Sequence, residues 1–191
     1  MDSVRLIYVI AIQTLTMIGG TSPTNGREHE NVDPVPIGGD RRGQFAQIAF
    51  GTILINVCGA YHLYYHSSDT VGILENLLFF GFLSMFSLRM YCYWVLGHFF
   101  TFSLLIKKGH QLITTGPYQY LVHPSYTAQI GCCLLGLLFL RSYLVMVPMI
   151  PYALVVVLKR AKMEENMLRL HFGDQFDKYM SVRNRFIPGV Y

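Results

Sequence analysis

The sequence predicts an all-α integral membrane protein with about five transmembrane helices, including a C-terminal helical hairpin, and an amphipathic C-terminal helix. Two observations support this prediction. The chain of 191 residues is 52% hydrophobic and only 14% charged, whereas soluble domains carry about 25% charged residues. Its apolar residues also gather in segments that approach the roughly 20 residues a helix needs to cross a bilayer. A net charge of +4 without a Lys/Arg-rich run argues against nucleic-acid binding.

Five apolar segments are the candidate spans, and they cover residues 4–20, 45–65, 71–96, 126–140 and 143–158. The last two are short and are separated only by Arg141 and Ser142. We therefore expect a tight hairpin whose outer ends lie on the same side of the membrane. The first segment also loosely resembles a cleaved signal peptide. Cleavage would conflict with the arginine pair before the second span, so we favour a retained helix.

The remaining segments connect or follow these spans. Residues 21–40 are rich in Gly, Pro, Asn and Asp, which predicts a loop. After residue 158, Leu168, Phe172, Phe176 and Tyr179 recur at spacings of three or four. This pattern predicts an amphipathic helix at the membrane surface, with Gly173 as a candidate interruption.

The basic residues predict the orientation of the chain. Those near the hairpin's outer ends are Lys107, Lys108, Lys159, Arg160 and Lys162. The positive-inside rule places that side in the cytosol. Residues 66–70 and the N-terminus then lie on the opposite side, and Arg41 and Arg42 on the cytosolic side.

The cysteines lie within apolar segments and have no CxxC spacing; they are Cys58, Cys92, Cys132 and Cys133. We expect small buried or lipid-facing side chains, with neither a metal site nor a disulfide framework.

A polar, turn-prone block at residues 116–126 opens the predicted hairpin. Pro124 suits the first turn of a helix, which leaves His123 just before exposed backbone N–H groups that favour an anion. The alternative is a capping turn with an interfacial aromatic belt formed by Tyr118, Tyr120 and Tyr126. The block by itself leaves both interpretations open.

A second polar block follows the hairpin. Arg160 and Glu164 share a helix face, and Glu165 lies one step around it. A solvated, salt-bridged helix end is the ordinary explanation of such a charge run. The hairpin, however, places these charges beside His123. Two carboxylates, an arginine and an imidazole suit a zwitterion with an ammonium and a carboxylate, and S-adenosylmethionine is such a ligand.

Together the two blocks resemble the isoprenylcysteine carboxyl methyltransferases and the related phospholipid methyltransferases. That family combines G-x-Y-x-Y-x-R-H-P-x-Y, two spans, and R-x-x-x-E-E-x-x-L-x-x-x-F-G-x-x-Y-x-x-Y. The matching residues are Gly116, Tyr118, Tyr120, His123, Pro124, Tyr126, Arg160, Glu164, Glu165, Leu168, Phe172, Gly173 and Tyr179. The segments 96–100 and 109–116 also fit, so the resemblance covers about residues 96–191. It implies N-terminal transmembrane helices in residues 1–95 and a methyltransferase region in residues 96–191.

The resemblance implies a protein-S-isoprenylcysteine O-methyltransferase of the endoplasmic reticulum, with its active site facing the cytosol. Such an enzyme transfers a methyl group from S-adenosylmethionine to the C-terminal carboxylate of a prenylated cysteine. Its partners would be prenylated protein C-termini or prenylcysteine small molecules, and membrane lipid. The implied catalytic residues are Arg160, Glu164 and Arg89. The implied cofactor-binding residues are His110, Gln111, Leu112, Ile113, Gly116, Tyr118, His123, Pro124, Tyr126, Glu164 and Glu165.

One position departs from the family pattern, because Val122 stands where the family commonly has arginine. Arg89, inside the third candidate span, is a candidate substitute; it either faces a substrate carboxylate or reaches the interface. Two other functions therefore stay open. An enzyme that methylates an amine lipid head group or another small lipophile would need a base such as His98, His110 or a glutamate. A non-catalytic membrane relative is the other alternative, suggested by Val122.

Overall fold

The computed structural model describes residues 3–19, 41–66, 70–100, 106 and 108–189. Its helices are α1 (Ser3–Gly19), α2 (Arg41–His66), α3 (Ile73–Leu96), α4 (Pro124–Phe139), α5 (Tyr143–Phe172) and α6 (Asp174–Ser181). Short 3₁₀ turns cover η1 (Gly97–Phe99) and η2 (Gly116–Gln119). Over these described ranges no strand is present, and one isolated bridge joins Leu121 to Asn184. The predicted all-α class is confirmed, whereas the predicted 21–40 loop lies outside the described residues.

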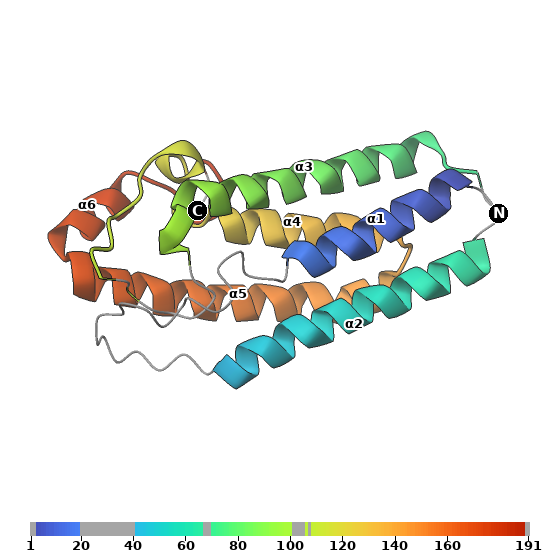
Figure 1. The fold of residues 1–191 in the computed structure, drawn as a ribbon, viewed down its shortest axis with the longest axis horizontal. Helices are drawn as coiled ribbons and strands as arrows, with labels where there is room; N and C mark the ends of the chain where they lie inside the picture. The colour runs from blue at the N-terminus through green and yellow to red at the C-terminus, as the bar shows by residue number, and fades with distance from the viewer. Residues whose placement is uncertain (1–2, 20–40, 67–69, 101–105, 107, 190–191) are drawn as a thin grey trace.

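The first five helices run lengthwise and alternate in direction, so that the chain passes back and forth between two ends (Figure 1). Helix α3 packs against α4, α4 against α5, and α1 against both α2 and α3. The C-terminal ends of α3 and α5, the start of α4 and the whole of α6 lie at one end (Figure 1). The predicted hairpin is present, because only Leu140, Arg141 and Ser142 separate α4 from α5.

One apolar core joins four of these helices. Val9 and Ile12 of α1 pack with Cys58 of α2 and with Phe79 and Phe82 of α3. The end of α4 and the residue after it add Leu137, Phe139 and Leu140. All these side chains are buried, and apolar burial is the main favourable term in folding.

Among the described residues, two helices are long and apolar enough to cross a membrane, one over residues 73–99 and α5 over residues 143–172. Two shorter apolar helices cover Ser3–Thr16 and Pro124–Phe139. The count of five spans is therefore not confirmed by length and hydropathy. Each predicted span in the described part of the chain nevertheless coincides with a helix.

The last predicted span is the first part of a longer helix, α5. It continues well beyond residue 158, to Phe172, and contains Pro148 and Pro151 within its length. A separate surface helix that includes Leu168 and Phe172 was therefore wrong. Gly173 ends α5 with a φ of 53°, a conformation that glycine adopts without the Cβ clash of other residues.

The apolar side of α6 also differs from the prediction. Phe176 and Tyr179 are buried against Val122 rather than presented to a membrane surface. Leu112, Leu168, Phe172 and Met180 surround this cluster. The pattern of spacing identified an amphipathic helix correctly, but the protein itself covers its apolar face.

A polar cluster lies at the opposite end of the bundle, where α2 ends and α3 begins. Fully buried Arg5 donates to Glu75 at 2.9 Å and pairs with the imidazole of His62, also at 2.9 Å. Arg141, in the turn between α4 and α5, donates to the same Glu75 oxygen at 2.7 Å and lies 3.4 Å from His66. The cluster thus ties α1, α2, α3 and the hairpin turn together.

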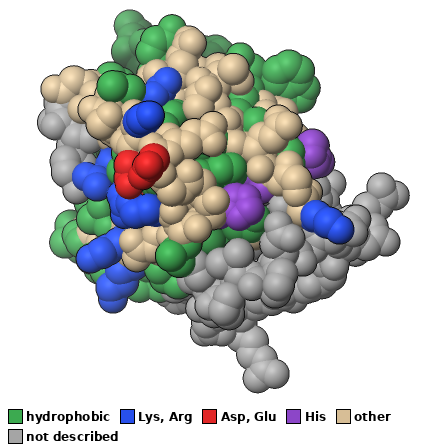
Figure 2. All heavy atoms as spheres, turned by 90° about the vertical axis from the view of Figure 1, so that its left-hand side faces the viewer, with side chains coloured by type: hydrophobic (Ala, Val, Ile, Leu, Met, Phe, Trp, Pro, Cys, Tyr) green, Lys and Arg blue, Asp and Glu red, His purple; other side chains and the backbone are tan. Residues whose placement is uncertain are grey.

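Charged side chains are distributed unevenly at the end that carries α6. Figure 2 shows several Lys and Arg side chains on one side of this face around a small acidic patch, and histidines with a further basic side chain on the other side. The basic side chains in this part of the chain include Lys159, Lys162, Arg169, Lys178 and Arg183.

Candidate active site

The first block forms a compact turn in front of α4. Gly116 adopts a φ of 59°, and a Cβ atom there would lie 3.1 Å from Val95 of α3. The chain therefore approaches α3 closely at a glycine. Pro117 and Tyr118 follow as buried residues in η2. Pro124 then occupies the first turn of α4 with His123 as its N-cap residue, as predicted.

His123 meets the second block through Glu165. The two side chains are 4% and 6% exposed, and His123 Nε2 lies 3.1 Å from Glu165 Oε1. An ionised carboxylate only accepts hydrogen bonds, so Nε2 carries the proton in this pair. Helix α5 has thus brought Glu165 back to the start of α4, as the hairpin predicted.

Arg185 binds the same oxygen of Glu165, with its Nε donating at 3.0 Å. The segment that follows α6 runs beside the first block and holds Arg185 there. Val122 N donates to the carbonyl of Asn184 at 3.0 Å, and His123 N to that of Arg185 at 2.9 Å. Thr127 Oγ1 continues this contact with the carbonyl of Phe186 at 2.7 Å.

Arg160 and Glu164 form a second network on the neighbouring face of α5. Arg160 Nε donates to the Tyr126 hydroxyl at 2.9 Å, and that hydroxyl donates to Glu164 Oε2 at 2.6 Å. A phenol links the cation to the carboxylate, so the predicted pair of charges is connected through the first turn of α4. The two carboxylates of the second block consequently have separate partners.

Arg89 lies beside this network. Its guanidinium donates to the carbonyl of Ser125 at 3.2 Å and to Gln129 Oε1 at 2.9 Å. It also lies over the ring of Tyr93, 5.1 Å from the centroid. The Ser125 contact places Arg89 next to Tyr126, at the side of the site that faces α3.

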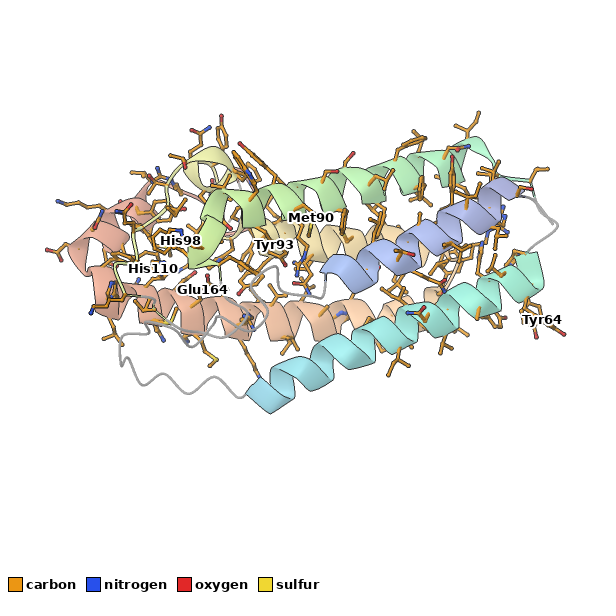
Figure 3. The ribbon with its side chains drawn as sticks, in the orientation of Figure 1. Tyr64, Met90, Tyr93, His98, His110 and Glu164 are labelled. Carbon is orange, nitrogen blue, oxygen red and sulfur yellow. The ribbon has the colours of Figure 1, made fainter. Side chains whose placement is uncertain are left out.

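The remaining predicted residues form the wall toward α5 and α6. His110 lies with its ring centroid 4.8 Å from that of Phe99 and 5.8 Å from that of Phe172. Gln111 is exposed, whereas Leu112 and Ile113 are half-buried. Figure 3 shows Tyr93, His98, His110 and Glu164 at the same end of the molecule, between α3 and α5, and Tyr64 at the other end.

Tyr179 fixes the first block to α6. Its hydroxyl donates to the carbonyls of Tyr118 at 2.7 Å and Leu121 at 3.3 Å. Burial raises the pKa of Tyr179 to about 12, and burial also raises the pKa of Tyr118 well above its usual value. Both phenols therefore keep their protons at neutral pH. The Tyr179 hydroxyl therefore donates its hydrogen bonds to the turn at neutral pH.

Sequence reasoning missed Arg185 as a site residue. The sequence shows only an arginine shortly before Pro188 in a short polar segment. The place of Arg185 in the site depends on how the chain returns from α6 to the first block. Val122 was recognised as a departure, and the structure shows its consequence: the side chain is buried in the apolar cluster with Phe176 and Tyr179. The guanidinium that contacts Glu165 is that of Arg185, in the segment after α6.

The comparisons with known proteins agree with this geometry. Residues 77–170 match the model of the isoprenylcysteine carboxyl methyltransferase family. The match extends from α3 through Arg160, Glu164 and Glu165, and it confirms the resemblance that the motifs indicated. A search of curated proteins found no match. The family match supports a membrane methyltransferase, and the two long apolar helices support association with a membrane.

Proposed function

We propose that this chain, whose residues 77–170 match the isoprenylcysteine carboxyl methyltransferase family, is an S-adenosylmethionine-dependent protein-S-isoprenylcysteine O-methyltransferase. The observation that carries the proposal is the meeting of the two blocks within that family domain. Glu165 lies 3.1 Å from His123, and Glu164 lies 2.6 Å from the Tyr126 hydroxyl. The hairpin therefore joins the acidic residues of α5 to the turn that opens α4.

The charged groups suit the cofactor's chemistry. Its amino-acid end is a zwitterion, which needs a carboxylate for its ammonium and a cation or N–H donor for its carboxylate. Glu164 and Glu165 supply the first, and Arg185 and His123 supply the second. When bound, the cofactor supplies an electrophilic methyl group on a sulfonium. We assign the residues of the turn and of the segment 110–113 to the cofactor site.

The acceptor explains why the site needs no catalytic base. A carboxylate is already ionised near neutral pH, so no proton has to be removed before its oxygen forms the new bond. The work of the protein is then to align the acceptor, hold its charge and exclude water, which is a proximity effect. We assign Arg89 and Arg160 to the acceptor carboxylate, because both lie beside Tyr126.

The membrane arrangement follows from the helices. We propose that α1 to α5 cross the membrane in turn and that the end carrying α6 faces the cytosol. The basic residues of that end support this orientation. We also propose the endoplasmic reticulum as the compartment, residues 1–95 as the membrane scaffold and residues 96–191 as the methyltransferase region.

A second candidate acceptor is an amine lipid head group. An ammonium must lose a proton before it can accept a methyl group, so such an enzyme needs a base. His98 and His110 lie at the same end as Glu164 (Figure 3), which favours this alternative over other substrates. The carboxylate remains our proposal because the arginines of the site suit an anionic acceptor.

The test is methyl transfer from labelled S-adenosylmethionine by the full chain in membranes. A farnesyl-cysteine analogue and phosphatidylethanolamine are offered in parallel. Label in the farnesyl-cysteine product alone supports the proposal. Label in the amine lipid alone identifies the second candidate, and no label in either, with intact protein, contradicts both.

A further inference from the structure

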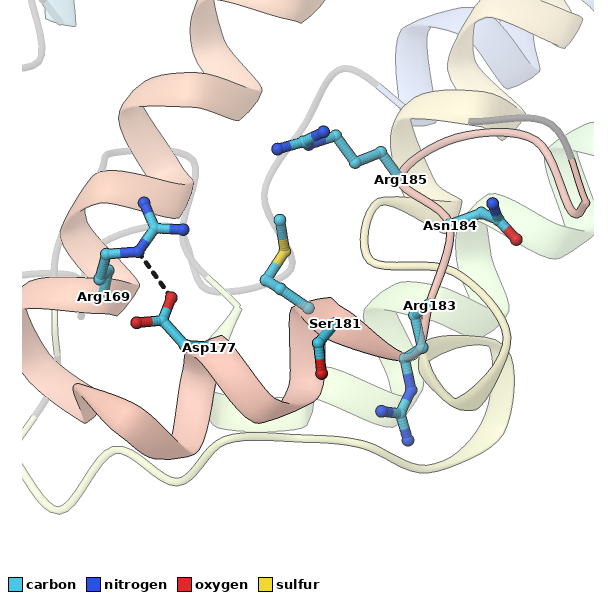
Figure 4. Close-up of a pocket in the computed structure, with 7 residues that line it drawn as sticks. Arg169, Asp177, Ser181, Arg183, Asn184 and Arg185 are labelled. Atoms are coloured by element: carbon cyan, nitrogen blue, oxygen red, sulfur yellow. Dashed lines mark hydrogen bonds and ion pairs between the residues drawn. The ribbon is translucent and has the colours of Figure 1, made fainter.

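A polar groove lies beside the candidate site, at the end of the molecule that carries α6 (Figure 4). Its volume is about 450 Å³. The charged and hydroxyl-bearing residues that line it are Arg169, Asp177, Ser181, Arg183 and Arg185. We call it the arginine groove.

The arginine groove has an excess of positive charge. Three arginines line it with one aspartate, and two of them have a carboxylate partner: Arg169 Nε donates to Asp177 Oδ1 at 2.7 Å, and Arg185 Nε donates to Glu165 Oε1 at 3.0 Å. Arg169 and Asp177 are both about half exposed. Figure 4 shows the guanidinium of Arg185 pointing toward the side where this pair lies. An excess of positive charge in an accessible groove favours an anionic ligand.

The position of Arg169 along α5 places the groove on the water-facing side of the lipid head groups. The apolar part of α5 ends at residue 158, and Lys159, Arg160 and Lys162 follow it. Arg169 lies in the last turn of the helix, about 16 Å beyond residue 158, and the head-group layer is roughly 5–7 Å thick. A tilted helix and the long arginine side chain bring the guanidinium back toward the phosphates.

The exposed side chains next to the groove also suit contact with lipid. Leu170 and Val182 are each 74% exposed, and they adjoin Arg169 and Arg183 in sequence. Exposed apolar side chains next to basic ones are typical of surfaces that lie at a membrane interface. The apolar side of α6 itself is buried in the protein, so the charges of the groove are left to make the membrane contact.

We propose that the arginine groove binds the phosphate of an anionic phospholipid head group. The planar guanidinium matches phosphate oxygens through two parallel N–H donors, and basic pockets at helix ends on the cytosolic side bind such head groups. Because Arg185 also binds Glu165, the lipid lies next to the candidate site. The proposal requires a membrane protein but does not depend on methyl transfer.

The experiment titrates the purified full chain in micelles with phosphatidylglycerol or phosphatidylcholine of the same acyl chains and counts bound lipids by native mass spectrometry. Phosphatidylglycerol should bind at least about five-fold more tightly. Replacing Arg169 and Arg183 with Gln should weaken its binding by roughly five-fold for each arginine. Lys178→Gln, an exposed neutralisation on α6 outside the groove, should change it by less than about two-fold.

A second variant keeps the test decisive, because Arg183 also donates to the carbonyls of Gln119 and Tyr179. Ser181 is exposed, so Ser181→Glu adds a negative charge to the groove without removing those contacts. It should weaken phosphatidylglycerol binding and leave phosphatidylcholine binding unchanged. Equal binding of both lipids, or unchanged binding in Ser181→Glu, would overturn the proposal. Displacement of phosphatidylglycerol by equimolar glycerol 3-phosphate would overturn the assignment to a lipid.

Discussion

Glu165 accepts hydrogen bonds from His123 and Arg185 on one oxygen. This residue therefore joins α5 to the start of α4 and to the segment after α6. The carboxylate is 6% exposed, and a buried carboxylate is stable only with such partners. The candidate site therefore depends on this side chain to hold three parts of the chain together.

Glu165→Gln should weaken S-adenosylmethionine binding by about ten-fold to a hundred-fold. The substitution keeps the size of the side chain but removes the charge, and a hydrogen bond to a charged group contributes about 1.5–3 kcal/mol. Isothermal titration calorimetry on detergent-purified protein measures the affinity. Asp174→Asn, which neutralises an exposed carboxylate on α6, is the matched control and should bind normally. Unchanged affinity in a well-folded Glu165→Gln protein would remove Glu165 from the cofactor site.

Val122→Arg restores the residue that the family commonly has, yet we expect it to lower stability and not to raise activity. The side chain at this position is 5% exposed among Phe176 and Tyr179. A guanidinium there has no carboxylate in the cluster and would lose its hydration, which is costly. Thermal unfolding in detergent should show a fall in Tm of several degrees, with Val122→Ile close to the wild type. Higher methyl transfer by Val122→Arg would show that the position still belongs to the site.

The α4–α5 hairpin and the N-terminal helices α1 and α2 have distinct roles in the fold. The α4–α5 hairpin positions both blocks, whereas α1 and α2 pack through apolar core residues and through the polar cluster of Arg5, His62, Glu75 and Arg141. In that cluster the arginines only donate, so His62 must accept from Arg5 through an unprotonated Nε2. Glu75 is the acceptor that both arginines share.

Glu75→Gln should therefore destabilise the protein much more than an exposed change of the same kind. It would leave two guanidinium groups without their carboxylate, and breaking a buried ion pair from one side costs about 3–5 kcal/mol. Asp177→Asn removes the acid of an exposed pair, for which about 0–1 kcal/mol is expected. Unfolding in a graded detergent series compares the two variants. Equal stability of both would show that the cluster does not hold the helices together.

Much of the fold could be predicted because local patterns determine the elements. Arg141 and Ser142 were the only polar residues between two apolar segments, which was sufficient to predict the hairpin and the meeting of the blocks. The extension of α5 to Phe172 was not predicted, since polar residues beyond residue 158 suggested a separate helix. The position of Arg185 and the burial of α6 could not be predicted either. Both depend on the direction that the chain takes after Gly173, and the spacing of apolar residues does not indicate that direction.

At the scale of the whole molecule, the two ends of the bundle differ in chemistry. One end holds a buried polar cluster that joins four parts of the chain. The other end holds the two blocks, the arginine groove and a group of basic side chains (Figure 2). A cofactor from water would reach this second end directly, and a lipid-anchored acceptor would reach it along the helices.

The pH dependence should distinguish the acceptors in the assembled enzyme. With farnesyl-cysteine, kcat/KM should be flat between about pH 6 and 8, because the acceptor carboxylate protonates only near pH 3.3–3.7. With an amine acceptor the rate should rise with pH as the amine or a histidine loses its proton nearer neutrality. The measurement is kcat/KM for each acceptor at saturating cofactor. A rising limb on farnesyl-cysteine would mean that a base takes part and would contradict the proposed role of the site.

The most direct test of the central claim is the chemical form of the transferred methyl group. The chain is given labelled S-adenosylmethionine and farnesyl-cysteine, and the recovered product is treated with mild alkali. A methyl ester hydrolyses and releases volatile labelled methanol, whereas a methyl group on nitrogen stays bound. We expect volatile label from the wild-type product and a strong reduction of it in Glu165→Gln. Label that resists alkali would contradict the claim that this site methylates a carboxylate.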